Sequence, residues 1–410
     1  MRLNELVVPK ENEKVFKITD FEEITDFCLN VTCGQTIELQ KHKVEKLSQG
    51  FSTCVATYFA NNRIFFYSSD KYIYEYKDYR NVKLDQCESQ PILVPIIYEG
   101  KEEVLVVNSL KAFVLGKSER EFSIPKGSCF ASYDNRIFIA QGTSIYFGGK
   151  FDSENMSMDL LNIGSINTFS YDGDILALVP YEDNLVVFCK KAVYVLNISK
   201  SNDFTFTRCV ETQLDIKERT VAKVKDEIFF VSNKKFCSYK EGKIKVIDVV
   251  LEKYLSEGVL TASVYGEYYM LPFTMLNENY IFLFSVRTRK LHIINNIVGN
   301  FVGDKYLYET TTKRLHQITE NMPITGEWTS TTLDFGSHKK KVITEIGITS
   351  TTRAELYVFS ETGYRYFSIE GGSCYKKINL TGANFYFSII PGYKGASIKN
   401  LQIKYKILGE

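Results

Sequence analysis

The sequence is poor in the residues that build disulfide frameworks and metal sites. Its nine cysteines are odd in number and include no Cys-x-x-Cys pair, so neither a disulfide framework nor a thiolate zinc site is expected. Most of the cysteines are instead predicted to be reduced, half-buried strand residues. The four histidines lack a second histidine at ligand spacing and a recognisable triad partner. We therefore expect surface positions for His42, His292, His316 and His338.

Neither sign of charge dominates the chain. Lys and Arg number 50 against 49 Asp and Glu, with a sequence pI near 7.5, which argues against a broad electrostatic surface for nucleic acid or an acidic membrane. No apolar run approaches the roughly 20 residues that span a bilayer. The start MRLNELVVPKENEKVFK lacks the apolar segment of a signal peptide. The expectation is a protein made in a reducing cytosol, with no membrane segment.

Motifs of enzyme chemistry are also missing. The sequence contains no G-x-x-x-x-G-K-[ST], no G-x-G-x-x-G and no G-x-S-x-G. Asp172 and Asp174 in YDGDILAL fit half of a calcium loop or a carboxylate pair. Because no further oxygen ligands follow at a fixed spacing, a hairpin turn is the predicted role of this stretch. We expect no enzyme activity, no catalytic residue, no metal site and no cofactor.

Aromatic residues are abundant, with 27 Tyr and 29 Phe, and they suit a pleated, half-buried surface. Seven stretches share one layout of a polar turn, an apolar strand, a short turn and a second strand. The spacings between successive openings are 40, 33, 48, 43, 41 and 37 residues, and a period of about 40 is typical of a four-stranded β-propeller blade. The first strands open at Arg63, Glu103, Arg136, Asn184, Glu227, Tyr268 and Lys305.

The predicted fold is all-β: a β-propeller of about seven blades followed by a small antiparallel β-sandwich. A four-stranded sheet of this length cannot bury both of its faces alone, and radial stacking covers each blade with the next. We expect an N-terminal segment leading into the propeller over 1–50, the propeller over 51–321 and the sandwich over 322–410. Residues before Phe51 are expected to complete the ring by pairing with the last blade. One short helix is predicted over 247–258, with Asp248 as its N-cap.

Past residue 321 the repeat stops and shorter alternating strands follow. In NLQIKYKIL, Leu401 and Ile403 belong to an apolar face, whereas Gln402 and Lys404 belong to a face expected to be wet. About seven short strands in this region predict an antiparallel sandwich. The clearest of them cover 355–360, 364–369, 384–390 and 400–408.

The stretch GEWTSTTLDFGSHKKK opens this region and holds the single tryptophan of the chain. Trp328 is predicted to anchor the change from propeller to sandwich, and the alternative is an aromatic platform for a ligand. Together with Asp334, Phe335 and Gly336 it forms our set of domain-junction or interaction candidates. The lysines at 339–341 are predicted to form an exposed strand edge that resists edge pairing.

The layout of an N-terminal segment, propeller repeats and a closing sandwich resembles that of virion β-propeller proteins of tailed bacteriophages, of the tail nozzle, hub or neck-associated type. Two short motifs carry the resemblance. The N-terminal motif is matched loosely by Asp26, Asn30, Val31, Gly34 and Ile37. The second motif, W-x-[ST]-x-x-x-D-F-G with a following K-x-[IV], is matched by Trp328, Ser330, Asp334, Phe335, Gly336, Lys341 and Val342.

The resemblance implies a structural component of a virion tail or neck, forming part of a conduit or its closure by protein–protein assembly. Its implied partners are portal, adaptor or tail proteins and further copies of the chain, with DNA passing transiently and without specific binding. The implied location is the virion, after synthesis in the host cytoplasm. The alternative is a receptor-binding or adhesin-like propeller that recognises a host-surface glycan or protein, and a glycan-acting enzyme is the third class.

Overall fold

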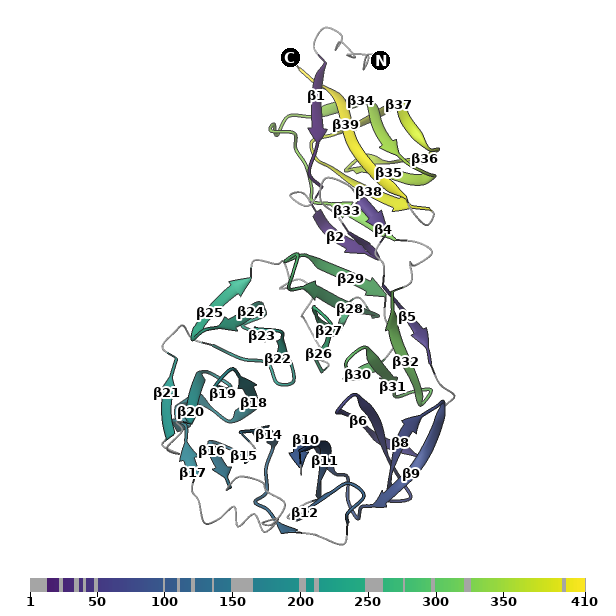
Figure 1. Cartoon of the computed structure of the whole chain (residues 1–410). Coiled ribbons are helices and arrows are strands. Elements are labelled where there is room, and N and C mark those ends of the chain that lie inside the picture. The colour runs from purple at the N-terminus through teal and green to yellow at the C-terminus, as the bar shows by residue number, and fades with distance from the viewer. Residues whose placement is uncertain are drawn as a thin grey trace. The chain divides into compact units, whose positions relative to one another are not determined.

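A computed structural model describes most of the chain, and among the residues it describes the regular elements are β-strands and the 3-10 turn Ser170–Asp172 (Figure 1). It describes residues 13–21, 25–32, 37–39, 42–47, 51–98, 100–108, 111–118, 122–134, 136–148, 165–198, 204–209, 214–247, 261–275, 277–295, 299–320, 326–392 and 396–409. The predicted helix over 247–258 lies almost wholly outside these residues. Within them, no helix is long and apolar enough to cross a membrane. The fold class is all-β, as predicted.

Seven four-stranded antiparallel sheets form the β-propeller, each a meander of consecutive strands except the last. Six of them follow the chain in order: β6–β9 (Cys54–Ala60, Arg63–Ser68, Tyr72–Lys77, Arg80–Gln86), β10–β13 (Ile92–Tyr98, Lys101–Asn108, Lys111–Val114, Phe122–Ser123), β14–β17 (Cys129–Tyr133, Arg136–Gln141, Ser144–Phe147, Ser165–Asn167), β18–β21 (Ile175–Tyr181, Asn184–Cys189, Val193–Ile198, Phe204–Arg208), β22–β25 (Ala222–Val224, Glu227–Ser232, Lys235–Lys240, Lys243–Ile247) and β26–β29 (Ser263–Tyr265, Tyr268–Met275, Glu278–Ser285, Leu291–Asn295).

The seventh sheet closes the ring with a strand from the other end of the propeller sequence. It combines β30 (Gly299–Gly303), β31 (Tyr306–Glu309) and β32 (Arg314–Thr319) with β5 (Lys43–Lys46). Just after β5, the Leu47 amide donates a hydrogen bond to the Leu315 carbonyl, with N and O 2.9 Å apart. The expected pairing of residues before Phe51 with the last blade is therefore observed.

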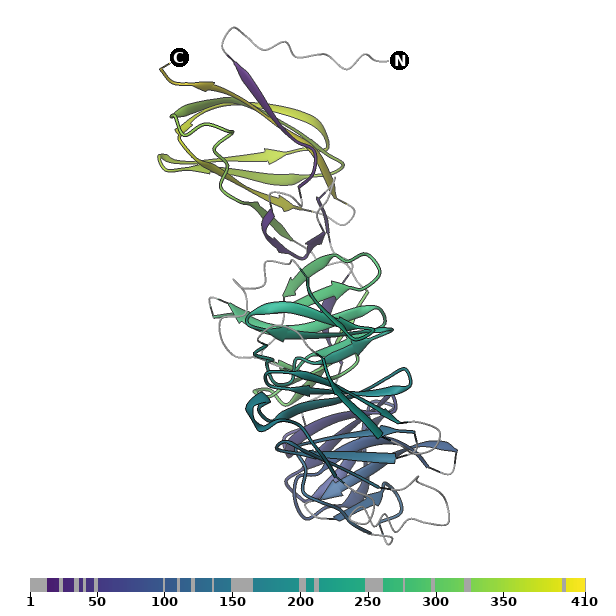
Figure 2. The ribbon, with the colours of Figure 1, turned by 90° about the vertical axis from the view of Figure 1, so that its left-hand side faces the viewer.

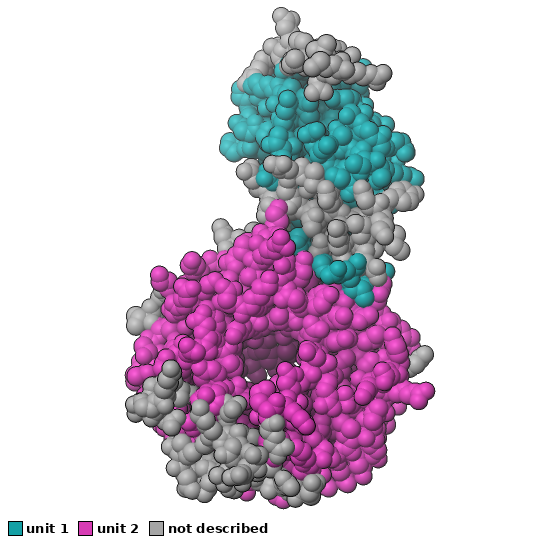
Figure 3. All heavy atoms as spheres, viewed as in Figure 1, with its two compact units in different colours: residues 1–43, 291–295, 319–410 teal, residues 44–290, 296–318 magenta. Residues whose placement is uncertain are grey.

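The repeated stretches of the sequence correspond to the second and third strands of each sheet. Arg63, Arg136 and Glu227, for example, open second strands. The second strands are buried on both faces, as every residue of Glu227–Ser232 shows, because each sheet packs against a sheet on either side. One hydrophobic cluster joins the fourth and fifth sheets, and another joins the first and seventh. Figure 2 shows the stacked sheets from the side, and Figure 3 shows the hollow at the centre of this unit.

A second compact unit consists of two antiparallel sheets around one hydrophobic core. We call it unit 1, as in Figure 3, and the propeller unit 2. One sheet has the order β3-β4-β39-β34-β37, with β1 also paired to β39, and the other has the order β2-β33-β38-β35-β36. The strands are β1 (Lys14–Ile18), β2 (Thr25–Leu29), β3 (Val31–Thr32), β4 (Ile37–Leu39), β33 (Glu327–Ser330), β34 (Lys341–Ser350), β35 (Ala354–Ser360), β36 (Gly363–Ile369), β37 (Gly372–Gly382), β38 (Phe385–Pro391) and β39 (Ser397–Ile407).

The N-terminal strands belong to unit 1, whereas the sequence predicts only a segment leading into the propeller over 1–50. β1 pairs along β39, and β2 pairs with β33. Unit 1 comprises 1–43, 291–295 and 319–410, and unit 2 comprises 44–290 and 296–318. The division assigns β29 (Leu291–Asn295) to unit 1, although this strand is paired in the sixth sheet of the propeller. The physical reason that β1 belongs to unit 1 lies in the long strand β39. Over Leu401–Tyr405, the backbone N–H and C=O groups on one side of this strand need hydrogen-bond partners, and β1 supplies them.

Two lysines of unit 1 are buried, contrary to the sequence prediction. Lys341 opens β34, which is paired on both sides, so the expected exposed strand edge at 339–341 is wrong for this residue. Its ammonium donates to the carbonyls of Ser337, Lys339 and Ala383. Lys404, expected on a wet face, is also buried and forms a 2.7 Å ion pair with Glu345. Each buried charge is thus supplied with partners.

The buried Lys341 ammonium predicts a particular pH dependence. Burial lowers the pKa of Lys341 from its ordinary value of 10.5. Between the lowered pKa and 10.5 the unfolded state binds more protons than the folded state, so stability rises with pH in that window. Relative to Lys341→Met, the wild type should therefore gain stability as the pH rises toward 10.5. Urea unfolding midpoints of both proteins measure this, and a constant difference would contradict it.

Candidate interaction surface

The four residues selected from the sequence lie together in unit 1, but two of them are core residues. Trp328 in β33 is fully buried and meets Phe21 edge to face, with ring centroids 5.2 Å apart. Phe335 is also buried and stacks on Phe385, with centroids 5.4 Å apart. A ligand therefore has no access to the Trp328 ring, and the alternative of an aromatic platform at this position is wrong.

Asp334 and Gly336 form a tight turn around Phe335. The Asp334 carbonyl accepts from the Ser337 amide at 3.0 Å, and its carboxylate accepts from the Gly336 amide at 2.9 Å. Phe335 and Gly336 have φ values of 49° and 75°, the pair of positive angles found in a type I′ turn. The motif D-F-G thus has a structural role: it turns the chain back while inserting the Phe335 ring into the core.

Three of the four histidines are buried, whereas all four were predicted to lie on the surface. His42, His292 and His316 are at most 8% exposed, and only the His338 side chain is open to solvent. His292 and His316 lie in β29 and β32, strands with buried residues on both faces, and His316 is 3.0 Å from a Glu309 carboxylate oxygen. Within the described residues, no group of three or more His, Cys, Asp or Glu is arranged to hold a metal ion.

Asp172 is part of a 3-10 turn, Ser170–Asp172 (η2), and not of the predicted hairpin. The turn connects β17 to β18, the last strand of one sheet and the first of the next. The buried Asp172 carboxylate accepts two hydrogen bonds from Arg208, both 2.8 Å long, and one of 2.5 Å from the Tyr194 hydroxyl. These bonds, with that from Arg208 as the larger cause, lower the pKa of Asp172. Asp174 is exposed beside this turn.

The same turn exposes an aromatic pair on the propeller. Phe169 is 54% exposed and Tyr171 is 64% exposed, and their rings are stacked with centroids 5.2 Å apart. The Arg208 guanidinium lies 6.0 Å from the centroid of Tyr171. Most other large aromatic side chains of the propeller are buried between sheets, so this pair is an unusual feature of its surface.

A larger aromatic surface covers the outer face of β38, β35 and β36 in unit 1, strands labelled in Figure 1. Along β35, Leu356 and Val358 enter the core while Tyr357 and Phe359 face the other way. The register places Tyr366 opposite Tyr357, and Tyr364 and Tyr386 on either side of Phe359. We call these side chains the aromatic face: Tyr357, Phe359, Tyr364, Tyr366 and Tyr386.

The rings of the aromatic face stack on one another across the strands. Phe359 and Tyr386 have centroids 4.4 Å apart and planes within 5°, and Tyr357 and Tyr366 are 4.9 Å apart. Tyr364, Tyr366 and Tyr386 nevertheless remain 59%, 44% and 41% exposed. Since stacking covers much of the ring faces, the surface offers mainly ring edges and tyrosine hydroxyls. Such a mixture of apolar area and hydrogen-bonding groups is typical of protein interfaces.

The sequence gives only an ambiguous signal for this surface. In ELYVFS, both sets of alternating positions contain apolar residues. Alternation alone therefore does not distinguish the core face from the outer face. YRYFSI places two tyrosines at alternate positions, Tyr364 and Tyr366. This predicts that they share one face of a strand, but it does not indicate whether that face is buried or exposed. The pairing of β35 between β36 and β38 assembles the five rings, and that pairing is a long-range property of the fold.

Comparisons with known proteins show a likeness in fold. No protein-family model matches the chain, and no curated protein sequence matches it. A structure of streptogramin B lyase is 11% identical, covers 68% of this chain and 97% of its own, and has a TM-score of 0.48. The WD40 domain of Neurospora crassa Pan2 is 7% identical, covers 66% of this chain and 90% of its own, and has a TM-score of 0.45. These neighbours share the propeller-like all-β architecture, and nothing about activity follows from them.

Proposed function

We propose that the protein is a structural assembly component, of the tail or neck type that the resemblance to tailed-phage virion proteins implies. In this function the propeller is a stiff body, held together by the strand β5 that closes its seventh sheet. Unit 1 provides the contact to other protein chains. The aromatic face on β38, β35 and β36 is the observation that carries the proposal.

A second copy of the chain is the proposed occupant of the aromatic face. Soluble proteins seldom leave several neighbouring aromatic side chains exposed unless a partner covers them, and tyrosine is enriched among residues that dominate interface energies. β36, which carries Tyr364 and Tyr366 of the face, is also the last strand in the order of its sheet. An edge strand of this kind can pair with another chain. Copies of the chain are what a ring-built virion part requires.

Light scattering across a concentration series tests this proposal. The wild type should form a defined oligomer, and the double variant Tyr364→Ser with Tyr366→Ser should associate at least about tenfold more weakly, because it loses two exposed anchors. Tyr79→Ser is the matched control, since Tyr79 is 81% exposed on the propeller. A wild type that stays at the 47.1 kDa monomer mass at every concentration would refute assembly through a second copy.

A receptor-binding propeller is the alternative, and the Phe169–Tyr171 pair favours it. Exposed aromatic faces stack on sugar rings, and Arg208 beside Tyr171 adds a hydrogen-bond donor. Glycan-array binding that is lost in Phe169→Ser with Tyr171→Ser, and retained in the Tyr364 and Tyr366 double variant, would support this function. If both double variants still bound glycans on the array, the Phe169–Tyr171 pair would be excluded as the glycan-binding site.

A further inference from the structure

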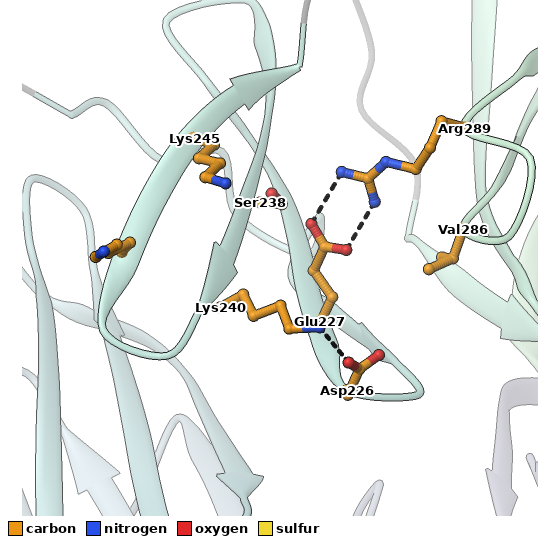
Figure 4. A pocket seen from close by; sticks show the side chains of 8 residues that line it. Asp226, Glu227, Ser238, Lys240, Lys245, Val286 and Arg289 are labelled. Carbon is orange, nitrogen blue, oxygen red and sulfur yellow. Dashed lines mark hydrogen bonds and ion pairs between the residues drawn. The ribbon is translucent and has the colours of Figure 1, made fainter.

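A basic hollow of about 370 Å³ lies within the propeller, between its fifth and sixth sheets (Figure 4). β23, β24 and β25 of the fifth sheet provide most of its lining. The turn between β28 and β29 of the sixth sheet provides Val286 and Arg289. The complete lining is Asp226, Glu227, Ser238, Lys240, Lys243, Lys245, Val286 and Arg289.

The antiparallel register explains why the lysines gather here. Lys240 pairs with Lys243, and Ser238 pairs with Lys245. Because side chains two residues apart share a face of a strand, all four point to the same side of the β24–β25 ladder. Like charges directly opposite each other destabilise an antiparallel pair. The arrangement therefore has an electrostatic cost that a bound anion would relieve.

The two carboxylates of the hollow already have cationic partners. Glu227 is bound by Arg289 through two hydrogen bonds of 2.7 and 3.2 Å, drawn in Figure 4. Asp226 is paired with Lys240. Among the described residues, no carboxylate pairs with the exposed ammonium groups of Lys243 and Lys245. The hollow thus keeps two uncompensated positive charges.

A buried hydroxyl is the second, independent observation. Ser238 is 1% exposed, lines the hollow, and makes no side-chain hydrogen bond to a described residue. Because this hydroxyl lines the hollow and bonds to no described residue, it is available to a ligand atom there. In Figure 4 the Lys245 ammonium points toward Ser238. Hydroxyl and ammonium donors side by side suit one oxyanion.

We propose that this hollow binds a phosphate or sulfate group. Lys243 and Lys245 supply charge, Ser238 donates a hydrogen bond, and Arg289 stays fixed by Glu227 at the opposite wall. A tetrahedral oxyanion has enough oxygen atoms to accept from these donors together. The site is independent of the aromatic face and of the proposed assembly.

Isothermal titration of the full-length protein with inorganic phosphate, at an ionic strength matched with sodium chloride, tests the site. Saturable binding is expected, and it should weaken as salt is added. Lys245→Gln should weaken it about tenfold or more through loss of a charge-assisted bond, and Lys245→Arg should retain most of it. Lys235→Gln is the matched control: Lys235 lies on β24, the strand of Ser238, but on its opposite face, so this change should leave binding unchanged.

Two further measurements make the outcome decisive. Ser238→Ala should weaken phosphate binding several-fold while leaving the thermal midpoint within about 2 °C of the wild type. Tighter binding of glucose 6-phosphate than of inorganic phosphate would identify a phosphorylated sugar as the source of the group, and equal binding would identify the free anion. Absence of saturable binding of both phosphate and sulfate, or equal binding by wild type and Lys245→Gln, would overturn the proposal.

Discussion

Removing the closing strand β5 should strongly destabilise the propeller. We expect a fragment of residues 43–321, which retains β5, to fold with one cooperative transition. A fragment of 48–321 should be less stable by on the order of 4 kcal/mol, or insoluble, because the edge of β32 loses its hydrogen-bonded partner. The second fragment also lacks Leu47, whose amide bonds the Leu315 carbonyl. Guanidinium unfolding of both fragments measures the difference.

Comparison of the two fragments measures only the effect of β5 on the closure of the propeller ring. Both lack the same parts of unit 1, so they differ only in residues 43–47. Leu315 and Tyr308 of the seventh sheet share a hydrophobic cluster with Ile64 and Phe66 of the first, and an open β32 edge loosens that contact. Equal unfolding midpoints for the two fragments would show that packing of the first sheet on the seventh closes the ring without β5.

Strands buried on both faces were the most predictable part of the fold. Each lies between two neighbouring sheets, so its sequence is a continuous apolar run, as in Glu227–Ser232. Outer strands carry no such run: Arg80–Gln86 has only exposed and half-buried residues. The period of about 40 therefore appears in the sequence through the second and third strands, and the other strands follow from it.

Contacts between distant residues account for what the sequence did not show. β1 and β4 are short, and nothing in KVFKI or IEL specifies pairing with β39, more than 350 residues away. The burial of Lys341 depends on the Ala383 carbonyl, 42 residues later. The basic hollow is partly visible as alternating lysines in SYKEGKIKV, but Arg289 joins it from the next sheet. Local patterns thus define strands, and the sites require their assembly.

Ile403→Asp should unfold unit 1 while leaving the propeller folded. Ile403 is fully buried in the core of unit 1, with Ile346 on one neighbouring strand and Phe16 on the other as its register partners. An aspartate there either places an unpaired charge among apolar side chains or becomes protonated, and it removes a large aliphatic group in both cases. We expect a loss of about 4 kcal/mol or more in unit 1.

Limited proteolysis with mass spectrometry separates the two units in this experiment. In Ile403→Asp, cleavage should spread through 326–409 while the seven sheets of the propeller resist digestion, since each of those sheets is buried against its own neighbours. Gln402→Asp introduces the same charge on the other face of β39 and should leave the digestion pattern unchanged. If Ile403→Asp made both units protease-sensitive together, they would form one cooperative folding unit, because the loss of one core would then have destabilised the other.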